Sequence, residues 1–152
     1  MTDKNKPKIY SGNYILTSSG IMLIGFFIFT CFMIHQCIQQ GNNKYWMIIF
    51  SFVLLFAFFT YQMNYFILTD EKLIVKNPVW YSKLIEFDLN QIKDITIIQP
   101  YRSPRCLHIK TESETQLVRA SSLKDKTWKT LKRDLENKSI LIHDKVGLLE
   151  NQ

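Results

Sequence analysis

Between residues 9 and 69 the chain carries a single formal charge, that of Lys44. All the other members of its 19 basic and 13 acidic side chains lie in residues 1–8 and 70–152. Since roughly a quarter of the residues in a soluble domain are charged, a gap of this length excludes a simple globular enzyme, a disordered tail and a fibrous repeat. The overall composition, 47% apolar and 21% charged, hides this division into two unlike parts.

The uncharged region contains two apolar runs, residues 15–38 and 45–61, separated by a polar turn at residues 39–44. A bilayer core about 30 Å thick needs about 20 apolar residues of helix, so both runs are candidates to span it, the second continuing to about residue 63. A charged side chain at the bilayer centre costs about 2.5–3.5 kcal/mol, and both runs avoid one. We therefore expect a membrane hairpin of two transmembrane helices over residues 15–63 (about 15–38 and 45–63), in preference to a hairpin buried in a soluble core.

Aromatic residues flank both runs, as is typical of a membrane–water interface, where Tyr and Trp are enriched. The expected interface anchors are Tyr10, Tyr14, Tyr45, Trp46, Tyr61 and Tyr65. A cleavable signal peptide is the competing interpretation of the first run. Because no small-residue cleavage site follows that run, we expect the first helix to be retained.

Lysines set the expected orientation, because positive charges close to a span favour the cytoplasmic side. The N-terminal segment, residues 1–14, has three lysines and the turn has only Lys44. Within about 20 residues of the second run, the range of this effect, come Lys72, Lys76 and Lys83. Both termini are therefore expected to face the cytoplasm, where the three cysteines imply no disulfide framework.

From residue 64 the pattern changes to short β-rich runs, at residues 65–69, 73–76, 84–89, 94–99, 105–111 and 115–120. Runs this short, separated by turns of a few residues, are typical of an antiparallel meander. A helix is expected next, with Ser121-Ser122 as its cap and an apolar stripe of Leu123, Thr127, Trp128, Leu131 and Leu135. The expected domain is α+β or all-β, an antiparallel β barrel or two-sheet roll capped by an amphipathic C-terminal helix.

Two segments resemble a known family. Residues 65–76, Y-F-I-L-T-D-E-K-L-I-V-K, and residues 86–95, E-F-D-L-N-Q-I-K-D-I, are similar to strands of bacterial PH-like domains, once catalogued as domain of unknown function 304. The resemblance covers residues 14 to about 138 and implies a PH-like barrel at residues 64–138, held under the cytoplasmic face by two spans and without catalytic activity. The chain departs from the family pattern at residues 77–81, N-P-V-W-Y, where a glycine turn is common, and in an apolar tail, residues 139–152.

Residues able to carry chemistry occur only in pairs. These are Cys31 with His35, Cys106 with His108, and His143 with Asp144. Structural metal sites take four ligands, so we predict no metal site and no cofactor. No strained nucleophile turn or glycine-rich phosphate loop is evident, so we expect no catalytic residues and no enzyme activity. His35 is the candidate for a functional group inside the membrane, and we expect it at the interface instead.

Two basic clusters are candidates for contact with lipid headgroups or a partner: the loop residues Arg102 and Arg105, and the helix residues Lys126, Lys129 and Arg133. Each basic residue near an anionic leaflet contributes about 1 kcal/mol. Ordinary solubility is the alternative, and we favour it for the helix. Eukaryotic phosphoinositide binding is not supported, because the first hairpin carries Asp70-Glu71, and nucleic-acid binding is not expected without a stacking motif.

The apolar tail is expected to dock, because a segment without burial does not offset its ordering entropy. We favour an edge strand at residues 139–142 on the chain's own domain. Docking on a partner is the alternative, with Leu148 and Leu149 as the contact residues.

These features predict a non-catalytic integral protein of the bacterial inner membrane that displays a PH-like domain at the cytoplasmic face and binds a protein or lipid headgroups. The alternative is a small accessory or immunity-type subunit of a larger membrane complex, bound through its hairpin. The expected partners are the bilayer, a protein partner or oligomer within it, and anionic lipids.

Overall fold

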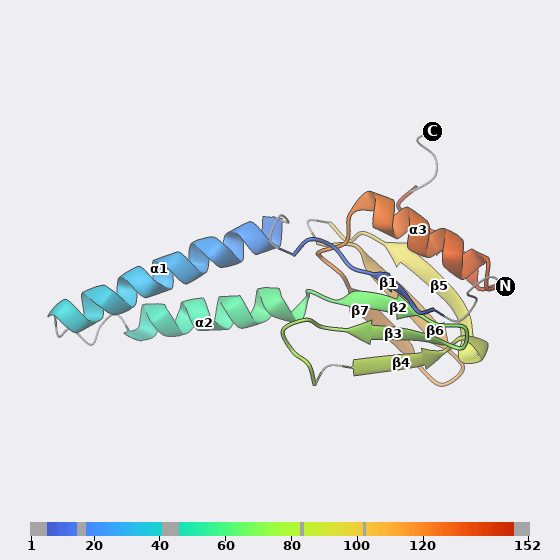
Figure 1. Ribbon diagram of the computed structural model, residues 1–152, viewed down its shortest axis with the longest axis horizontal. Coiled ribbons are helices and arrows are strands. Elements are labelled where there is room, and N and C mark those ends of the chain that lie inside the picture. The colour runs from blue at the N-terminus through green and yellow to red at the C-terminus, as the bar shows by residue number, and fades with distance from the viewer. Residues whose placement is uncertain (1–5, 15–17, 41–45, 83, 102, 148–152) are drawn as a thin grey trace.

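The computed structural model describes residues 6–14, 18–40, 46–82, 84–101 and 103–147. Two helices lie side by side and project from one end of a domain that contains two β-sheets and a third helix (Figure 1). A short 3₁₀ turn, Leu89–Gln91, connects two of the strands. The other elements are β1 (Lys8–Tyr10), α1 (Ser18–Gln40), α2 (Trp46–Tyr61), β2 (Tyr65–Leu68), β3 (Lys72–Lys76), β4 (Leu84–Asp88), β5 (Ile92–Ile98), β6 (Cys106–Thr111), β7 (Thr115–Arg119), α3 (Asp125–Glu136) and β8 (Leu141–Asp144).

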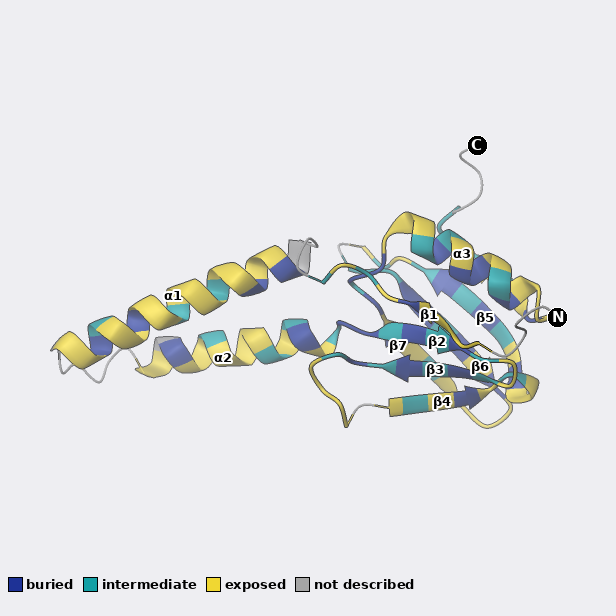
Figure 2. Cartoon of the chain, viewed as in Figure 1, coloured by how far each residue is buried: buried dark blue, intermediate teal, exposed yellow. Residues whose placement is uncertain are grey.

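Helix α1 contains a segment, Gly20–Gln39, that is long and apolar enough to cross a membrane. Only 6% of the most apolar stretch of this segment is buried by the rest of the protein. Exposed residues predominate along both α1 and α2 (Figure 2). A helix of this hydropathy in a soluble core is buried on most sides. The alternative of a hairpin buried in a soluble core therefore does not fit α1.

Helix α2 is apolar throughout but shorter, with 16 residues against 23 in α1. At 1.5 Å per residue it is about 24 Å long, less than a bilayer core of about 30 Å. In the part of the chain that the structure describes, α1 alone has the length of a membrane span. Instead of the expected two spans, the described residues contain one helix of spanning length, α1, beside a shorter apolar helix, α2. The two helices are in contact through Phe29 of α1 and Phe52 of α2, whose ring centroids are 4.7 Å apart.

The domain contains two four-stranded sheets, with the orders β1-β2-β3-β4 and β7-β6-β5-β8. All neighbouring strands are antiparallel except β5 and β8, which are parallel. The described residues include one bridge between strand partners outside these sheets, Met63↔Ala120. The six strands predicted from residue 65 to 120 are all present within two residues of their expected bounds. The α+β class is confirmed, but the two sheets do not close into an antiparallel barrel.

Strand β1 is a part of the domain that the sequence pattern did not predict. It precedes α1 in the chain, yet pairs with β2, which follows α2, in the register Lys8↔Leu68 to Tyr10↔Phe66. Tyr10 is 4% exposed and lies in the domain core. This corrects the expectation that Tyr10 is a membrane-interface anchor, because its ring is covered by protein.

A close backbone contact follows β1. A Cβ atom added to Gly12 would lie 1.6 Å from the carbonyl oxygen of Ser122. No side chain fits in that space, so glycine permits the N-terminal segment to pass directly against the chain that leads into α3.

Helix α3 covers the core with the predicted stripe. Trp128, Leu131 and Leu135 are at most 1% exposed, and Trp128 packs edge-on against Phe66 of β2, with ring centroids 5.8 Å apart. The expected cap was wrong: α3 begins at Asp125, and its first flanking residue, Lys124, makes no capping hydrogen bond through its side chain.

The hydroxyl groups of Ser121 and Ser122 form other hydrogen bonds. Ser121 donates to the carbonyl oxygen of Gln62 at 3.3 Å and Ser122 to that of Asn64 at 3.5 Å. The two serines therefore connect the segment after β7 to the segment between α2 and β2.

The first part of the tail docks on its own domain. Strand β8 pairs in parallel with β5, and Ile140 before it is buried in the core. A buried ion pair between Lys132 of α3 and Asp144 of β8 (2.8 Å) holds the strand under the helix. The predicted edge strand is present, two residues later than expected.

Candidate functional site

The strand registers define the end of the domain next to the helices. The first residue of β2, Tyr65, stands opposite the last residue of β3, Lys76. The Met63↔Ala120 bridge lies beside it, just past the end of β7. We call this the junction end. Helix α2 joins the domain there, and the β3–β4 loop lies on the same side (Figure 1).

Three buried polar residues, Thr60, Asn64 and Asn77, connect α2 to both sheets, and we call them the junction cluster. The Asn77 amide nitrogen donates to the carbonyl oxygens of Thr60 (2.9 Å) and Tyr61 (3.3 Å) and to Oδ1 of Asn64 (3.3 Å). Asn64 donates to the carbonyl oxygen of Arg119 at 2.6 Å. Carbonyl groups at the end of a helix lack their regular i+4 donors, so Asn77 acts as a side-chain cap for α2.

The loop between β3 and β4 is folded around the same asparagine. Oδ1 of Asn77 accepts hydrogen bonds from the backbone N–H groups of Val79 and Trp80, each at 2.9 Å. This is the local side-chain turn that asparagine favours. The indole Nε1 of Trp80 donates to Oγ1 of Thr60 at 3.0 Å. The loop is thus attached to the last turn of α2, while residues Trp80 and Tyr81 stay 42% and 89% exposed.

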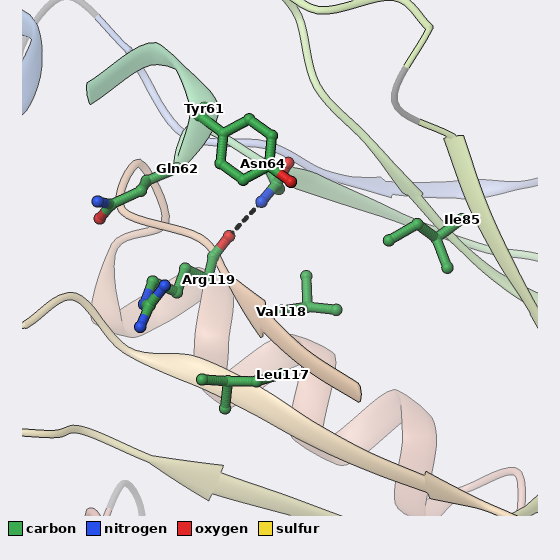
Figure 3. Close-up of a pocket in the computed structure, with 7 residues that line it drawn as sticks. All are labelled: Tyr61, Gln62, Asn64, Ile85, Leu117, Val118 and Arg119. Atoms are coloured by element: carbon green, nitrogen blue, oxygen red, sulfur yellow. Dashed lines mark hydrogen bonds between the residues drawn. The ribbon is translucent and has the colours of Figure 1, made fainter. Parts of the chain in front are cut away.

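A small pocket lies at the junction end, between the edges of β4 and β7 (Figure 3). Its volume is about 120 Å³, well below the roughly 300–1,000 Å³ of sites that bury a drug-sized molecule. The pocket therefore fits water or a small ion better than an organic ligand. Its lining residues are Tyr61, Gln62, Asn64, Ile85, Leu117, Val118 and Arg119.

The predicted loop cluster of basic residues is partly engaged within the chain. The Arg105 guanidinium donates to Oε1 of Gln99 (3.1 Å) and pairs with Asp125 (2.6 Å). It braces the β5–β6 loop against the start of α3, so its charge is largely neutralised locally. Arg102 lies outside the described residues.

The helix cluster is differently placed. Lys126 and Arg133 are exposed and Lys129 is half-buried. Helix α3 runs from the junction end along the long axis, away from α1 and α2 (Figure 1). The three residues therefore lie at increasing distances from the helix pair and do not form one face directed toward it.

The remaining predicted anchors and docking residues have mixed surroundings. Trp46 and Tyr61, at opposite ends of α2, are both 57% exposed. Tyr14 and Tyr65 are half-buried, and burial raises the pKa of Tyr14 to about 12. Tyr45, Leu148 and Leu149 lie outside the described residues.

Cys106, Asp144 and His35, three of the paired residues, have contacts within the chain. Burial raises the pKa of the Cys106 thiol, so it is not an activated thiolate. Asp144 pairs with Lys132 and accepts from the N–H groups of Val146 and Gly147, and His143 lies on the opposite face of the same strand. Nε2 of His35 lies 3.4 Å from the amide nitrogen of Gln39 on α1. Among the described residues, no three His, Cys, Asp or Glu side chains come together as a metal site.

One carboxylate links β1 to α3. Asp134 accepts hydrogen bonds from the Tyr10 hydroxyl (2.6 Å) and from Lys8 (3.0 Å). Burial opposes ionisation of this carboxyl group, but the two hydrogen bonds outweigh it and lower the pKa of Asp134. Burial, together with Asp134, raises the pKa of Tyr10.

No protein-family model, no curated protein and no solved structure matches this chain. Sequence reasoning missed the junction cluster, although residues 77–81 stood out as a departure from the PH-like pattern. Asn77 was the available signal, since asparagine before proline predicts a turn.

Proposed function

We propose that this protein is a non-catalytic integral protein of the bacterial inner membrane. A hairpin of two spans, α1 and α2, holds a PH-like domain at the cytoplasmic face, where the domain binds lipid headgroups or a protein. The observation that carries this proposal is the pairing of β1 with β2 across the two intervening helices.

This pairing constrains how the chain crosses a bilayer. Strand β1 comes before α1 and β2 comes after α2, so the chain returns to the side from which it started. If α1 crosses the membrane, α2 crosses it in the opposite direction. The shortfall of about 6 Å in α2 is accommodated by local thinning of the bilayer or by flanking residues, at a modest cost per ångström.

The pairing also argues against removal of α1 as a signal peptide. Cleavage after α1 would remove β1, and with it the buried ring of Tyr10 and the hydrogen bond from its hydroxyl to Asp134. A domain that depends on residues before the first helix keeps that helix.

The side chains of both helices support contact with lipid. Their polar groups bond within the helix: Thr30 donates to the carbonyl oxygen of Phe26 (2.7 Å) and Ser51 to that of Met47 (2.9 Å). Internal bonding of this kind is what a hydrocarbon environment requires. The lysines before α1 and after α2 favour a cytoplasmic position for the domain.

The PH-like assignment is supported by the order of the strands and the helix. The proposed binding role, without catalysis, is supported by the ion pairs that engage the carboxylates. Antiparallel strands β2–β7 are followed by one amphipathic helix that packs onto the core, the order the resemblance implies. The buried or part-buried carboxylates Asp134 and Asp144 are each paired with a lysine. Such groups hold elements together and are not poised for proton transfer.

Extraction and protease protection test the proposal. The full chain is expected to stay in the membrane fraction after alkaline carbonate treatment. Trypsin is expected to cut the lysine-rich domain in inverted inner-membrane vesicles and to leave it intact in spheroplasts. Release by carbonate would overturn the membrane anchor, and cleavage in spheroplasts alone would overturn the cytoplasmic orientation.

A further inference from the structure

We infer that the β3–β4 loop is a membrane-contact loop, whose residues Val79, Trp80 and Tyr81 enter the headgroup layer of the leaflet where α2 ends. This inference rests on the proposed hairpin and adds to it a lipid contact made by the domain itself. The ligand is the phospholipid bilayer at the boundary between headgroups and acyl chains.

The position of the loop follows from its hydrogen bonds. Asn77 binds the last carbonyl groups of α2, and the Trp80 indole binds the hydroxyl of Thr60 in the last turn. The indole therefore lies at the same level as the end of the helix. In a spanning hairpin that level is the membrane–water interface.

Because α2 is short, the surface of the hydrocarbon core lies beyond the last residue of the helix, on the side of the loop. A helix of about 24 Å ends short of the edges of a hydrocarbon core of about 30 Å. At the domain side, groups beyond Tyr61 are in position to cover part of the missing few ångströms. Trp80 is hydrogen-bonded to that last turn, so its ring is a large apolar group at this level.

Exposed apolar side chains of the domain are concentrated at the junction end. Among its described residues, eight large apolar residues are exposed. Five of them lie in loops or strand starts at this end, and the other three (Ile9, Leu117, Leu141) are scattered over three strands. The five are Val79, Trp80, Tyr81, Leu84 and Tyr101.

The chemistry of this group fits an interface better than either bulk phase. Tyr and Trp prefer the headgroup layer because the ring is sheltered there while the polar end stays hydrated. Lys76 and Arg119 flank the group at the strand ends and supply positive charge for phosphate groups. A contact of this kind would hold the domain in a fixed orientation on the bilayer.

The three tryptophans of the chain permit a direct test. Trp46 lies at the far end of α2, Trp80 in the loop and Trp128 in the domain core, where it is 1% exposed. Fluorescence is measured on the full chain in vesicles of phosphatidylcholine and phosphatidylglycerol, with acyl chains brominated near the headgroup as the quencher. Trp128 is kept in every variant, so the core is unchanged.

Three proteins are compared. Trp46→Phe reports on the loop, Trp80→Phe on the hairpin, and the double variant on Trp128 alone. The expected result is a loss of fluorescence in Trp46→Phe comparable to that in Trp80→Phe, with no loss in the double variant.

Quenching in Trp80→Phe but not in Trp46→Phe would overturn the loop contact and leave the hairpin intact. Absence of quenching in both would overturn the hairpin as well. As a second measurement, Tyr81→Ser in the Trp46→Phe background is expected to increase quenching of Trp80 by aqueous acrylamide, whereas Leu141→Ser, an exposed change at another edge, is expected to leave it unchanged. Equal effects of the two substitutions, as for a loop that meets a protein or only water, would contradict the lipid contact.

Discussion

Replacing Asn77 with alanine is expected to separate α2 from the β3–β4 loop and to destabilise the domain. The side chain makes three hydrogen bonds of 2.9 Å, to the carbonyl oxygen of Thr60 and from the N–H groups of Val79 and Trp80. A net value of about 1 kcal/mol for each bond gives about 3 kcal/mol. Water can reach the loop N–H groups after the change, so we expect a loss of about 2–3 kcal/mol in the free energy of unfolding.

The assay is thermal unfolding of the full chain in detergent, followed by near-ultraviolet circular dichroism, to which the buried Trp128 of the core contributes. At about 4–8 °C per kcal/mol for a domain of this size, the expected fall in Tm is about 10–20 °C. Asn90→Ala is the matched control, because Asn90 is exposed in the turn between β4 and β5. That variant is expected to change stability by less than about 0.5 kcal/mol. If both variants melt within about 3 °C of the wild type, the junction cluster does not hold the loop.

Three further expectations follow from the same structure. Gly12→Ala is expected to prevent stable docking of the N-terminal segment and therefore to lower Tm. Gly25→Ala is the control: its added Cβ meets nothing within 4 Å, so Tm is expected to stay unchanged or rise slightly. Equal Tm values for the two variants would refute the close contact at Gly12. Tyr10→Phe is expected to lower the free energy of unfolding by about 1–2 kcal/mol at neutral pH. Because the pKa of Asp134 is lowered in the folded state, the difference in stability between the variant and the wild type should shrink as the pH falls below about 4. Urea unfolding at pH 7 and pH 3 measures this difference, and a constant value would contradict the hydrogen bond from Tyr10 to ionised Asp134. Truncation after Lys138 is expected to destabilise the domain, because it removes β8 and the buried Ile140; an unchanged Tm in thermal melts would contradict the docking of β8 on its own domain.

Local patterns in the sequence predict the elements whose signals are local. Alternation of apolar and polar residues predicts β4, and the helical spacing of Trp128, Leu131 and Leu135 predicts the buried face of α3. Each of these signals depends on neighbours within one strand or a few helical turns, and the structure contains both elements.

The features that the sequence does not reveal depend on distant partners. Strand β1 is three residues long, and its partner β2 follows only after two helices. Ser121-Ser122 has the pattern of a helix cap, but its hydroxyls bind carbonyl groups about 58 residues away along the chain. In both cases a tertiary contact outweighs a local preference, and a single sequence carries no direct sign of such a contact.

The junction cluster shows the same limit at the candidate site. Asn77 attracts attention because it precedes a proline, yet Thr60 and Asn64 resemble ordinary residues at the end of an apolar helix. Their relation arises only when β3 returns alongside β2 and brings Asn77 against the last turn of α2. Sequence reasoning therefore indicated the turn and missed what the turn binds.

In the proposed topology the chain crosses the membrane twice, with β1 and the domain together on the cytoplasmic side. A reporter enzyme active only in the periplasm tests it most directly, inserted at Asn42 in one fusion and attached after Gln152 in another. Activity is expected for the insertion at Asn42 and none for the fusion after Gln152. Activity after Gln152, with a silent insertion at Asn42, would contradict the orientation; equal activity of the two fusions would contradict the second crossing.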